Sequence, residues 1–343
     1  MGVTEAFRAI AFSSIRFTVF TANAVVFGLL PVLVLVLRPA FRSAGGPEWV
    51  EGRDRLARRI EDLLEAALLT SAVATLLGIL LQATVVAGPG GEVSNSAIDA
   101  VISTSFGRWY LIRFPLLIGL FVLLSRRIRS AAFAGAGDER RAPVPWLIGW
   151  GVLGVGLLAT SSFSGHAFAG SPRTLSVAND LCHLVCAATW FTGIIVLAVL
   201  LPTVWRGRSE DSVSILAPTV SRFARLAAVV IALIALTGTI NSLFDVEHPM
   251  DLVESGYGVA LMIKIVVFLG ILGLGAVNHF YVTRRFEKAE GDTGRVAKLF
   301  RKTIALELAF GISVMILTGV LTGLEKTRQS GAVPRSVSSA PRT

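Results

Sequence analysis

Residues 17–37 read FTVFTANAVVFGLLPVLVLVL, a run without a single charged side chain. A helix needs roughly 20 apolar residues to cross the hydrocarbon core of a bilayer, so this run is long enough for a span. It is too long for the apolar core of a cleavable signal peptide, and it is followed by Arg38 rather than by a small-residue cleavage site. We therefore expect a retained transmembrane helix near the start of the chain.

The rest of the chain repeats this pattern. Its 343 residues are 53% hydrophobic and 16% charged, whereas soluble domains carry about 25% charged residues. Apolar runs lie near 17–37, 63–87, 109–125, 145–164, 179–202, 222–243, 259–282 and 303–324. The predicted fold class is all-α: a polytopic membrane bundle of about eight transmembrane helices over residues 1–327, followed by a disordered outer tail at 328–343. Little length is left for a soluble catalytic domain, so we do not expect an enzyme.

Basic residues are distributed unevenly between the connections. Those after the odd-numbered spans are rich in arginine and lysine, whereas those after the even-numbered spans hold only Arg108 and Arg173. The positive-inside rule places the basic connections in the cytoplasm and both termini outside, in a multi-pass protein of the cytoplasmic membrane. This topology explains the net charge of +9 without a nucleic-acid partner. The stretch from Pro47 to Leu64 predicts a short amphipathic helix on the cytoplasmic surface before the second span.

Several polar residues interrupt the apolar runs. An ionisable side chain at the centre of a bilayer costs roughly 2.5–3.5 kcal/mol even on a lenient scale, so each is a candidate functional residue. Near the outer end lie Arg113, His166, Asp180, His183, Asn241 and Lys264. We expect Arg113 and Lys264 each to be paired with a carboxylate or a polar carbonyl. Near the inner end, Asn278 should lie at the depth of Glu307, and we favour a hydrogen bond between their helices over a gate.

Residues with metal-binding side chains gather in the fifth span. Helical geometry places Asp180, His183 and Cys186 on one broad face, with Trp190 almost directly beneath His183. Imidazole and thiolate ligands suit copper. The alternative is a structural role for these residues. The histidines would hydrogen-bond to neighbouring helices, while Cys186 would pack as a small apolar residue and Trp190 would fill apolar space.

Two further copper ligands lie in the sixth connection, where His248 and Met250 offer an imidazole and a thioether on the predicted outer side. They form a candidate step for collecting copper. Together with His166, His183 and Cys186 they make up the predicted metal ligands. The alternative is that these exposed loop residues have no specific role.

In these details the chain resembles the copper-resistance protein D (CopD) family of bacterial and archaeal membrane proteins, over nearly its whole length. The resemblance rests on Thr104, Phe106, Gly107, Trp109 and Arg113, on Ser164-Gly165-His166-Ala167 with Asp180, His183, Trp190 and Gly193, and on Arg222-Phe223, Thr237-Gly238, Asn241, Tyr257-Gly258, Leu261, Lys264, Asn278 and Glu307. It implies copper handling, usually described as movement of copper ions across the cytoplasmic membrane for uptake or resistance. We expect the lipid bilayer as surroundings and an extracytoplasmic copper-binding protein as a candidate partner.

The sequence departs from the family pattern at Thr192, where a second glycine is common, and after Asn278, where arginine often follows. Neither change affects the His pair. Motifs for ATP binding, for a phosphorylated aspartate and for a CxxC metal entry are missing, which excludes an ATP-driven pump. Copper movement would then be passive or coupled to another gradient.

Two rival interpretations use the same residues. Arg113 and Lys264 would repel a copper ion and suit an anionic ligand better. A haem b with His166 and His183 as axial ligands, and with its propionates paired to the two cations, would instead make the protein a membrane electron carrier. A scaffold without a substrate is the third class, and the cost of burying so many ionisable groups argues against it.

Overall fold

The computed structural model describes residues 3–44, 50–88, 93–124, 144–164, 173–205, 210–246, 248–283 and 293–324. In these ranges, eight helices are long and apolar enough to cross a membrane, which confirms the predicted all-α bundle. The predicted tail at 328–343 lies outside the described residues.

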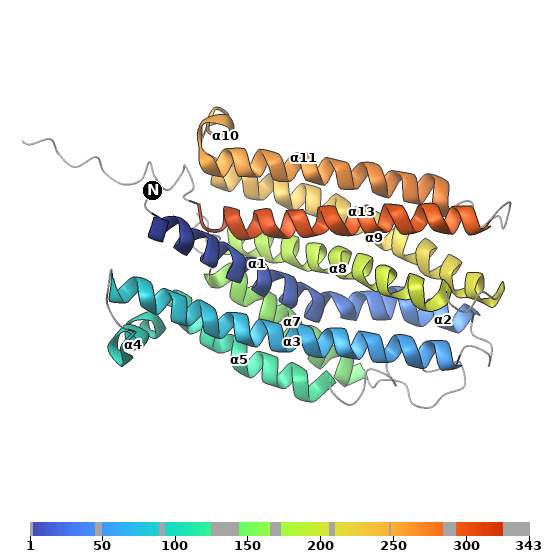
Figure 1. Ribbon diagram of the computed structural model, residues 1–343, viewed down its shortest axis with the longest axis horizontal. Helices are drawn as coiled ribbons and strands as arrows, with labels where there is room; N and C mark the ends of the chain where they lie inside the picture. Colours follow the sequence, from blue (N-terminus) through green and yellow to red (C-terminus); the bar gives the residue numbers. More distant parts are fainter. Residues whose placement is uncertain are drawn as a thin grey trace, which may run out of the picture.

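The spans lie side by side along the long axis of the molecule (Figure 1). The first consists of α1 (Val3–Val32), the π-helical turn η1 (Leu33–Leu37) and α2 (Arg38–Ala44); the others are α3 (Val50–Ala87), α5 (Ser105–Leu124), α7 (Val144–Ser164), α8 (Arg173–Trp205), α9 (Glu210–Asp245), α11 (Gly256–Val277) and α13 (Thr293–Leu321). Two short helices, α4 (Asn95–Ser103) and α10 (Asp251–Glu254), lie at the same end of the bundle as the start of α1. The apolar patterns did not predict them, because each is too short to span.

The predicted amphipathic helix before the second span is not a separate element. Residues 50–87 form one continuous helix, α3. Its first turns are amphipathic as predicted, since Leu56 and Ile60 are buried while Arg58 and Arg59 are exposed. A helix that has begun adds one hydrogen bond per residue, and no proline or glycine pair interrupts the sequence between the amphipathic part and the apolar part.

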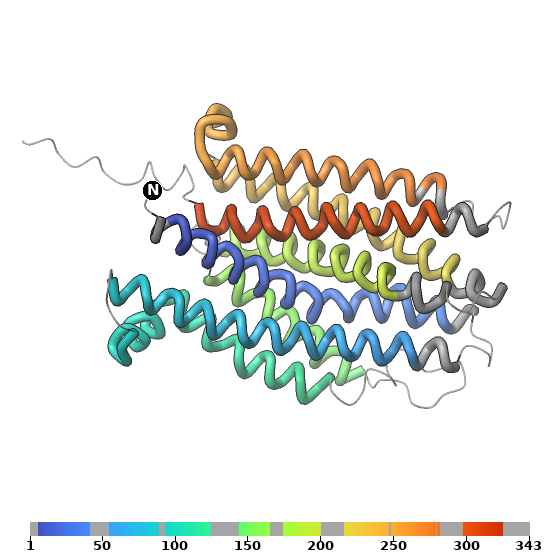
Figure 2. Tube along the Cα trace, in the orientation of Figure 1, coloured from blue at the N-terminus to red at the C-terminus, as the bar shows by residue number. Residues whose placement is uncertain are grey.

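Helix α1 is the centre of the bundle. The most apolar window of the first span is 67% buried, against 11% for the span formed by α11. Helix α1 packs on α3, α7, α8 and α13, and it runs through the middle of the traced chain (Figure 2). Helix α1 also approaches α13 closely at Gly319, where an added Cβ would lie 2.6 Å from the Ser13 carbonyl oxygen.

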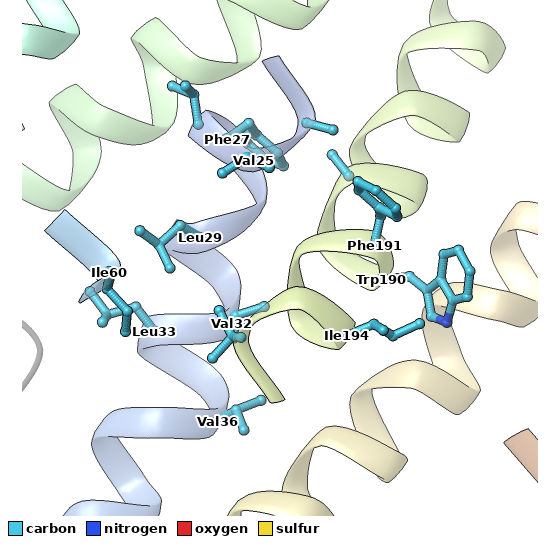
Figure 3. Packing of buried hydrophobic residues seen from close by; sticks show 14 of the residues in the cluster. Val25, Phe27, Leu29, Val32, Leu33, Val36, Ile60, Trp190, Phe191 and Ile194 are labelled. Atoms are coloured by element: carbon cyan, nitrogen blue, oxygen red, sulfur yellow. The ribbon is translucent and has the colours of Figure 1, made fainter. Parts of the chain in front are cut away.

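The closest helix contact joins α1 to α8. A Cβ added to Gly28 would collide with the carbonyl oxygen of Ala188 and would lie 2.5 Å from Oγ1 of Thr192. The Thr192 hydroxyl donates a hydrogen bond of 2.9 Å to the Ala24 carbonyl oxygen across the same contact. Figure 3 shows apolar side chains of the two helices near this contact, such as Leu29 and Val32 of α1 and Phe191 of α8. Only glycine allows the two backbones to come this close.

Replacing Gly28 with alanine should separate α1 from α8. Overpacking a close-packed interior typically costs about 1–3 kcal/mol, so we expect Gly28→Ala to lower the thermal unfolding midpoint of the purified protein. Gly273→Ala is the matched control, because nothing lies within 4 Å of a Cβ added there. Equal midpoints for the two variants would show that the contact is not tight in the folded protein.

The orientation predicted from the basic connections can be tested with reporter fusions. A reporter joined after Lys288 should be active in the cytoplasm, and one joined after Met250 should be active outside, because the arginine-rich connections are retained inside. The reverse pair of results would invert the topology.

Candidate functional site

A cluster of polar side chains lies where α8, α9 and α11 meet, at the end of the bundle that carries α10. We call it the α8 polar cluster; its members are Asn179, Asp180 and His183 of α8, Thr237, Asn241 and Asp245 of α9, and Tyr257 and Lys264 of α11. The sequence predicted Asp180, His183, Asn241 and Lys264 as functional residues of this region. The structure brings them together from three spans.

The hydrogen bonds of His183 define its tautomer. Its Nδ1 lies 3.0 Å from Oγ1 of Thr237. The Thr237 hydroxyl donates its own proton to the Leu233 carbonyl oxygen at 2.6 Å, so it accepts a hydrogen bond from the Nδ1–H of the ring. Nε2 is then the nitrogen with the free lone pair, and the ring has one further described partner, the backbone of Ile234. A neutral imidazole held through one nitrogen is the usual form of a metal ligand.

Space for the His183 ring is provided by Gly238. A Cβ at this position would lie 3.3 Å from Cε1 of His183, tighter than ordinary van der Waals contact. One helical turn before His183, Asn179 donates hydrogen bonds to Oδ1 of Asn241 at 2.7 Å and to the Thr237 carbonyl oxygen at 2.9 Å. These bonds hold α8 in register with α9.

Lys264 carries the positive charge of the cluster. Asp180 of α8 and Asp245 of α9 both attract its ammonium group. Tyr257, two turns before Lys264, donates a hydrogen bond of 2.7 Å from its hydroxyl to Oδ2 of Asp245. The lysine is therefore balanced by two carboxylates from neighbouring helices, as its position in the membrane requires.

Arg113 differs from the expectation of a carboxylate or carbonyl partner. Its side chain is 1% exposed. Hydroxyl groups of α7 receive it instead: Nε donates to Thr160 Oγ1 at 2.8 Å, and Nη2 donates to Ser161 and Ser164 at 3.3 and 3.4 Å. The guanidinium group also stacks over Tyr110, 4.0 Å from the ring centre, which adds a cation–π attraction. The sequence did not indicate these partners, because isolated serines and threonines are common in apolar helices.

Arg113 and Lys264 lie in different parts of the bundle. Helix α5, which carries Arg113, packs on α3, α4 and α7, whereas α11, which carries Lys264, packs on α10, α13 and η4 (Asn278–Thr283). The two helices lie at opposite edges of the bundle in Figure 2. Each cation also has its own protein partners. The haem b alternative, which paired both cations with one ligand, therefore gains no support.

The remaining predicted copper ligands are dispersed. His166 lies outside the described residues. Cys186 is buried in the apolar core, and His248 and Met250 are exposed just before α10. Among the residues that the structure describes, no group of three or more His, Cys, Asp or Glu side chains is placed to hold a metal ion. His183 is thus the one predicted metal ligand that the described structure places in a polar cluster.

A second polar group lies deeper in the bundle, at a cavity of about 350 Å³ between α8, α9, α11 and α13. Trp190, Asn278 and Glu307 line it, among mainly apolar side chains. Asn278 donates a hydrogen bond of 2.8 Å to Oε1 of Glu307, which is the predicted tie between their helices. Thr303 donates to Oδ1 of Asn278 at 2.5 Å. Thr303 was not predicted from the sequence, although it precedes Glu307 by one helical turn, the spacing at which helical side chains share a face.

Eight apolar helices in the described residues, with two groups of polar residues between them, define a multi-pass membrane protein. A family model described as "Copper resistance protein D-like, N-terminal domain" matches residues 7–174, and one described as "Copper resistance protein D" matches residues 217–321. The chain is 30% identical to Copper resistance protein D of Pseudomonas syringae pv. tomato, over 93% of this chain and 97% of that protein. It belongs to the copper resistance protein D family.

Two further relatives are less similar. Copper transport protein CutJ of Bacillus subtilis is 28% identical over 83% of this chain and 50% of its own length. Inner membrane protein YebZ of Escherichia coli is 26% identical over 47% of this chain and 53% of its own length. The match to the Pseudomonas protein covers nearly all of both chains, so the bundle as a whole is shared with that relative.

Proposed function

We propose that this protein moves copper ions across the cytoplasmic membrane and that His183 is a copper ligand on the outer side. One observation carries the proposal: the imidazole of His183, held by Thr237 through Nδ1, lies inside a polar cluster within a membrane span. An imidazole nitrogen suits copper. The relatives from Pseudomonas and Bacillus, which are named for copper resistance and copper transport, support copper as the cargo.

Asp180 is the proposed second ligand from the same helix. It precedes His183 by three residues, so the two side chains share a helix face. His166 is the proposed third ligand; it follows α7 in the sequence and belongs to the connection between α7 and α8. The positive-inside rule supports the outer location of all three, since the connections at this end of the bundle are poor in arginine and lysine.

Lys264 gives the site a means of releasing its cargo. In the structure, its ammonium group is attracted by Asp180 and repels positive charge at His183. A copper ion that binds Asp180 competes with Lys264 for the same carboxylate. Lysine then stabilises the empty site and limits the affinity for copper, and a transported ion must leave as well as enter.

Loss of the imidazole should abolish copper binding at this site. We expect purified His183→Ala to lose one bound copper ion relative to the wild-type protein, measured by metal analysis after dialysis. Cells that express the variant should also accumulate a different amount of copper from cells that express the wild type. Unchanged copper content in both measurements would overturn the assignment of His183.

Thr237 should matter through the orientation that it gives to the ring. Removing the group that holds a ligating histidine typically weakens metal binding by about 10–100-fold, so we expect Thr237→Val to weaken copper binding by a factor in this range. Thr239→Val is the control, because the Thr239 hydroxyl bonds only to the Ala235 carbonyl of its own helix, on an exposed face. Titration with copper in a competing chelator measures both variants, and equal affinities would contradict the role of Thr237.

A further inference from the structure

We propose that Glu307 binds a small monovalent cation, a proton or Na⁺, whose movement is coupled to copper transport. This inference rests on the proposed function. It concerns the second polar group, at the cavity between α8, α9, α11 and α13, which is separate from the His183 site.

The Glu307 carboxyl group is only half satisfied. The residue is 5% exposed. Oε1 accepts the hydrogen bond from Asn278, and Glu307 has no other polar partner in the described part of the chain, so Oε2 is left without one. Because Glu307 lines the cavity, an ion that enters the cavity can reach this carboxyl group. A carboxylate in a membrane interior that lacks a partner is costly, and bound cations are the means by which proteins offset that cost.

No protein cation balances this carboxylate within the described residues. Helix α13 packs against α1, α8, α11 and η4, and α9 forms another wall of the cavity. The ionisable residues of these six elements, other than Glu307, are Glu5, Arg8, Arg16, Arg173, Asp180, Cys182, His183, Cys186, Glu210, Asp211, Arg222, Arg225, Asp245, Tyr257, Lys264, His279, Tyr281, Arg295, Lys298, Arg301 and Lys302. None of them forms a described contact with Glu307. Lys264 is attracted by Asp180 and Asp245 in the other polar group. Outside the described side chains are those of Glu5, Arg173, Glu210, Asp211, His279 and Arg295.

The surroundings of Glu307 favour a small hard ion. Carboxylate and amide oxygens suit hard cations, whereas soft ions such as Cu(I) prefer sulfur. Among the described residues that line the cavity there is no sulfur ligand, and the polar side chains are Glu307, Asn278 and the Trp190 indole. Figure 3 shows the Trp190 ring pointing away from α1 towards α9, on the cavity side of α8. A site of this kind fits a coupling ion better than the copper cargo.

The backbone at Asn278 holds the group in place. Helix α11 ends there and continues as the π-helical turn η4. The Asn278 backbone N–H is shared between the carbonyl oxygens of Gly275 and Leu274, and its side chain joins Thr303 to Glu307 on α13. Wide turns of this type often mark functional sites in helices. Trp190 lies about 10 Å along α8 from His183, at 1.5 Å per residue, so the two polar groups share one supporting helix.

A first experiment tests cation binding without copper. Dicyclohexylcarbodiimide, an apolar reagent that adds to protonated carboxyl groups, is applied to the full-length protein in liposomes, and the modified residue is located by peptide mass spectrometry. We expect Glu307 to be modified. Slower modification on adding Na⁺ at constant pH identifies Na⁺. A rate that Na⁺ does not change, and that falls with pH only well above the ordinary glutamate pKa of about 4.3, identifies the proton. Failure to modify Glu307, or a rate that neither condition changes, would overturn the proposal.

A second experiment tests coupling. Copper uptake into proteoliposomes is measured with and without an imposed pH gradient or Na⁺ gradient. We expect one gradient to accelerate uptake by the wild type and Glu307→Gln to lose this response, because the amide keeps the acceptor for Asn278 but has neither the negative charge nor the titratable proton of the carboxyl group. Glu65→Gln, at an exposed glutamate of α3, should keep it. A Glu307→Gln variant with the wild-type response, or wild-type uptake that ignores both gradients, would refute coupling. If the wild type moves no copper, the copper function fails, and the labelling experiment alone then decides whether Glu307 binds the cation.

Discussion

The close approach of α1 and α8 at Gly28 is the contact on which the rest of the bundle depends. Inside a bilayer, apolar side chains gain little by leaving lipid for protein, so helices associate through tight packing and hydrogen bonds. Interhelical hydrogen bonds in a membrane average only about 0.6 kcal/mol. The single hydrogen bond from Thr192 to Ala24 is therefore too weak to join these two spans, which are the most buried of the eight. Packing along the whole contact, which Gly28 permits, supplies most of the attraction.

Helix α8, which makes this contact with α1, also contributes residues to both polar groups. One face contacts α1, and the remaining faces carry His183 towards α9 and Trp190 towards the cavity. Gly193 brings α9 close as well, because a Cβ there would collide with the ring of Phe223. The departure at Thr192, where the family often has glycine, does not loosen the contact. Its hydroxyl bonds to α1, so the larger residue takes up the space and adds a hydrogen bond.

The sequence predicted the number and type of the spans because the cost of exposing polar backbone to lipid allows few alternatives. It predicted less about the partners inside the bundle. Lys264 was expected to pair with a carboxylate or a polar carbonyl and is attracted by Asp180 and Asp245, since opposite charges at one depth have strong reasons to meet. The hydroxyl partners of Arg113 and the role of Thr237 were not predictable, because serine and threonine can satisfy themselves within their own helix. The sequence also did not reveal how far Arg113 lies from Lys264 across the bundle. The two residues appear equivalent in depth, and only the packing of α5 and α11 shows that they are far apart.

The two polar groups differ in how their charge is balanced. In the α8 polar cluster, two carboxylates face one lysine, so a cation that arrives there meets attraction and competition together. At the cavity, the Glu307 carboxyl group accepts a hydrogen bond from the Asn278 amide, and no cation contacts it among the described residues. A bundle with equal and complete charge balance at both positions would have no electrostatic reason to bind anything. Both polar groups lie against α8, and their charge balance is unequal. This difference makes an exchange between two cations physically reasonable in this fold.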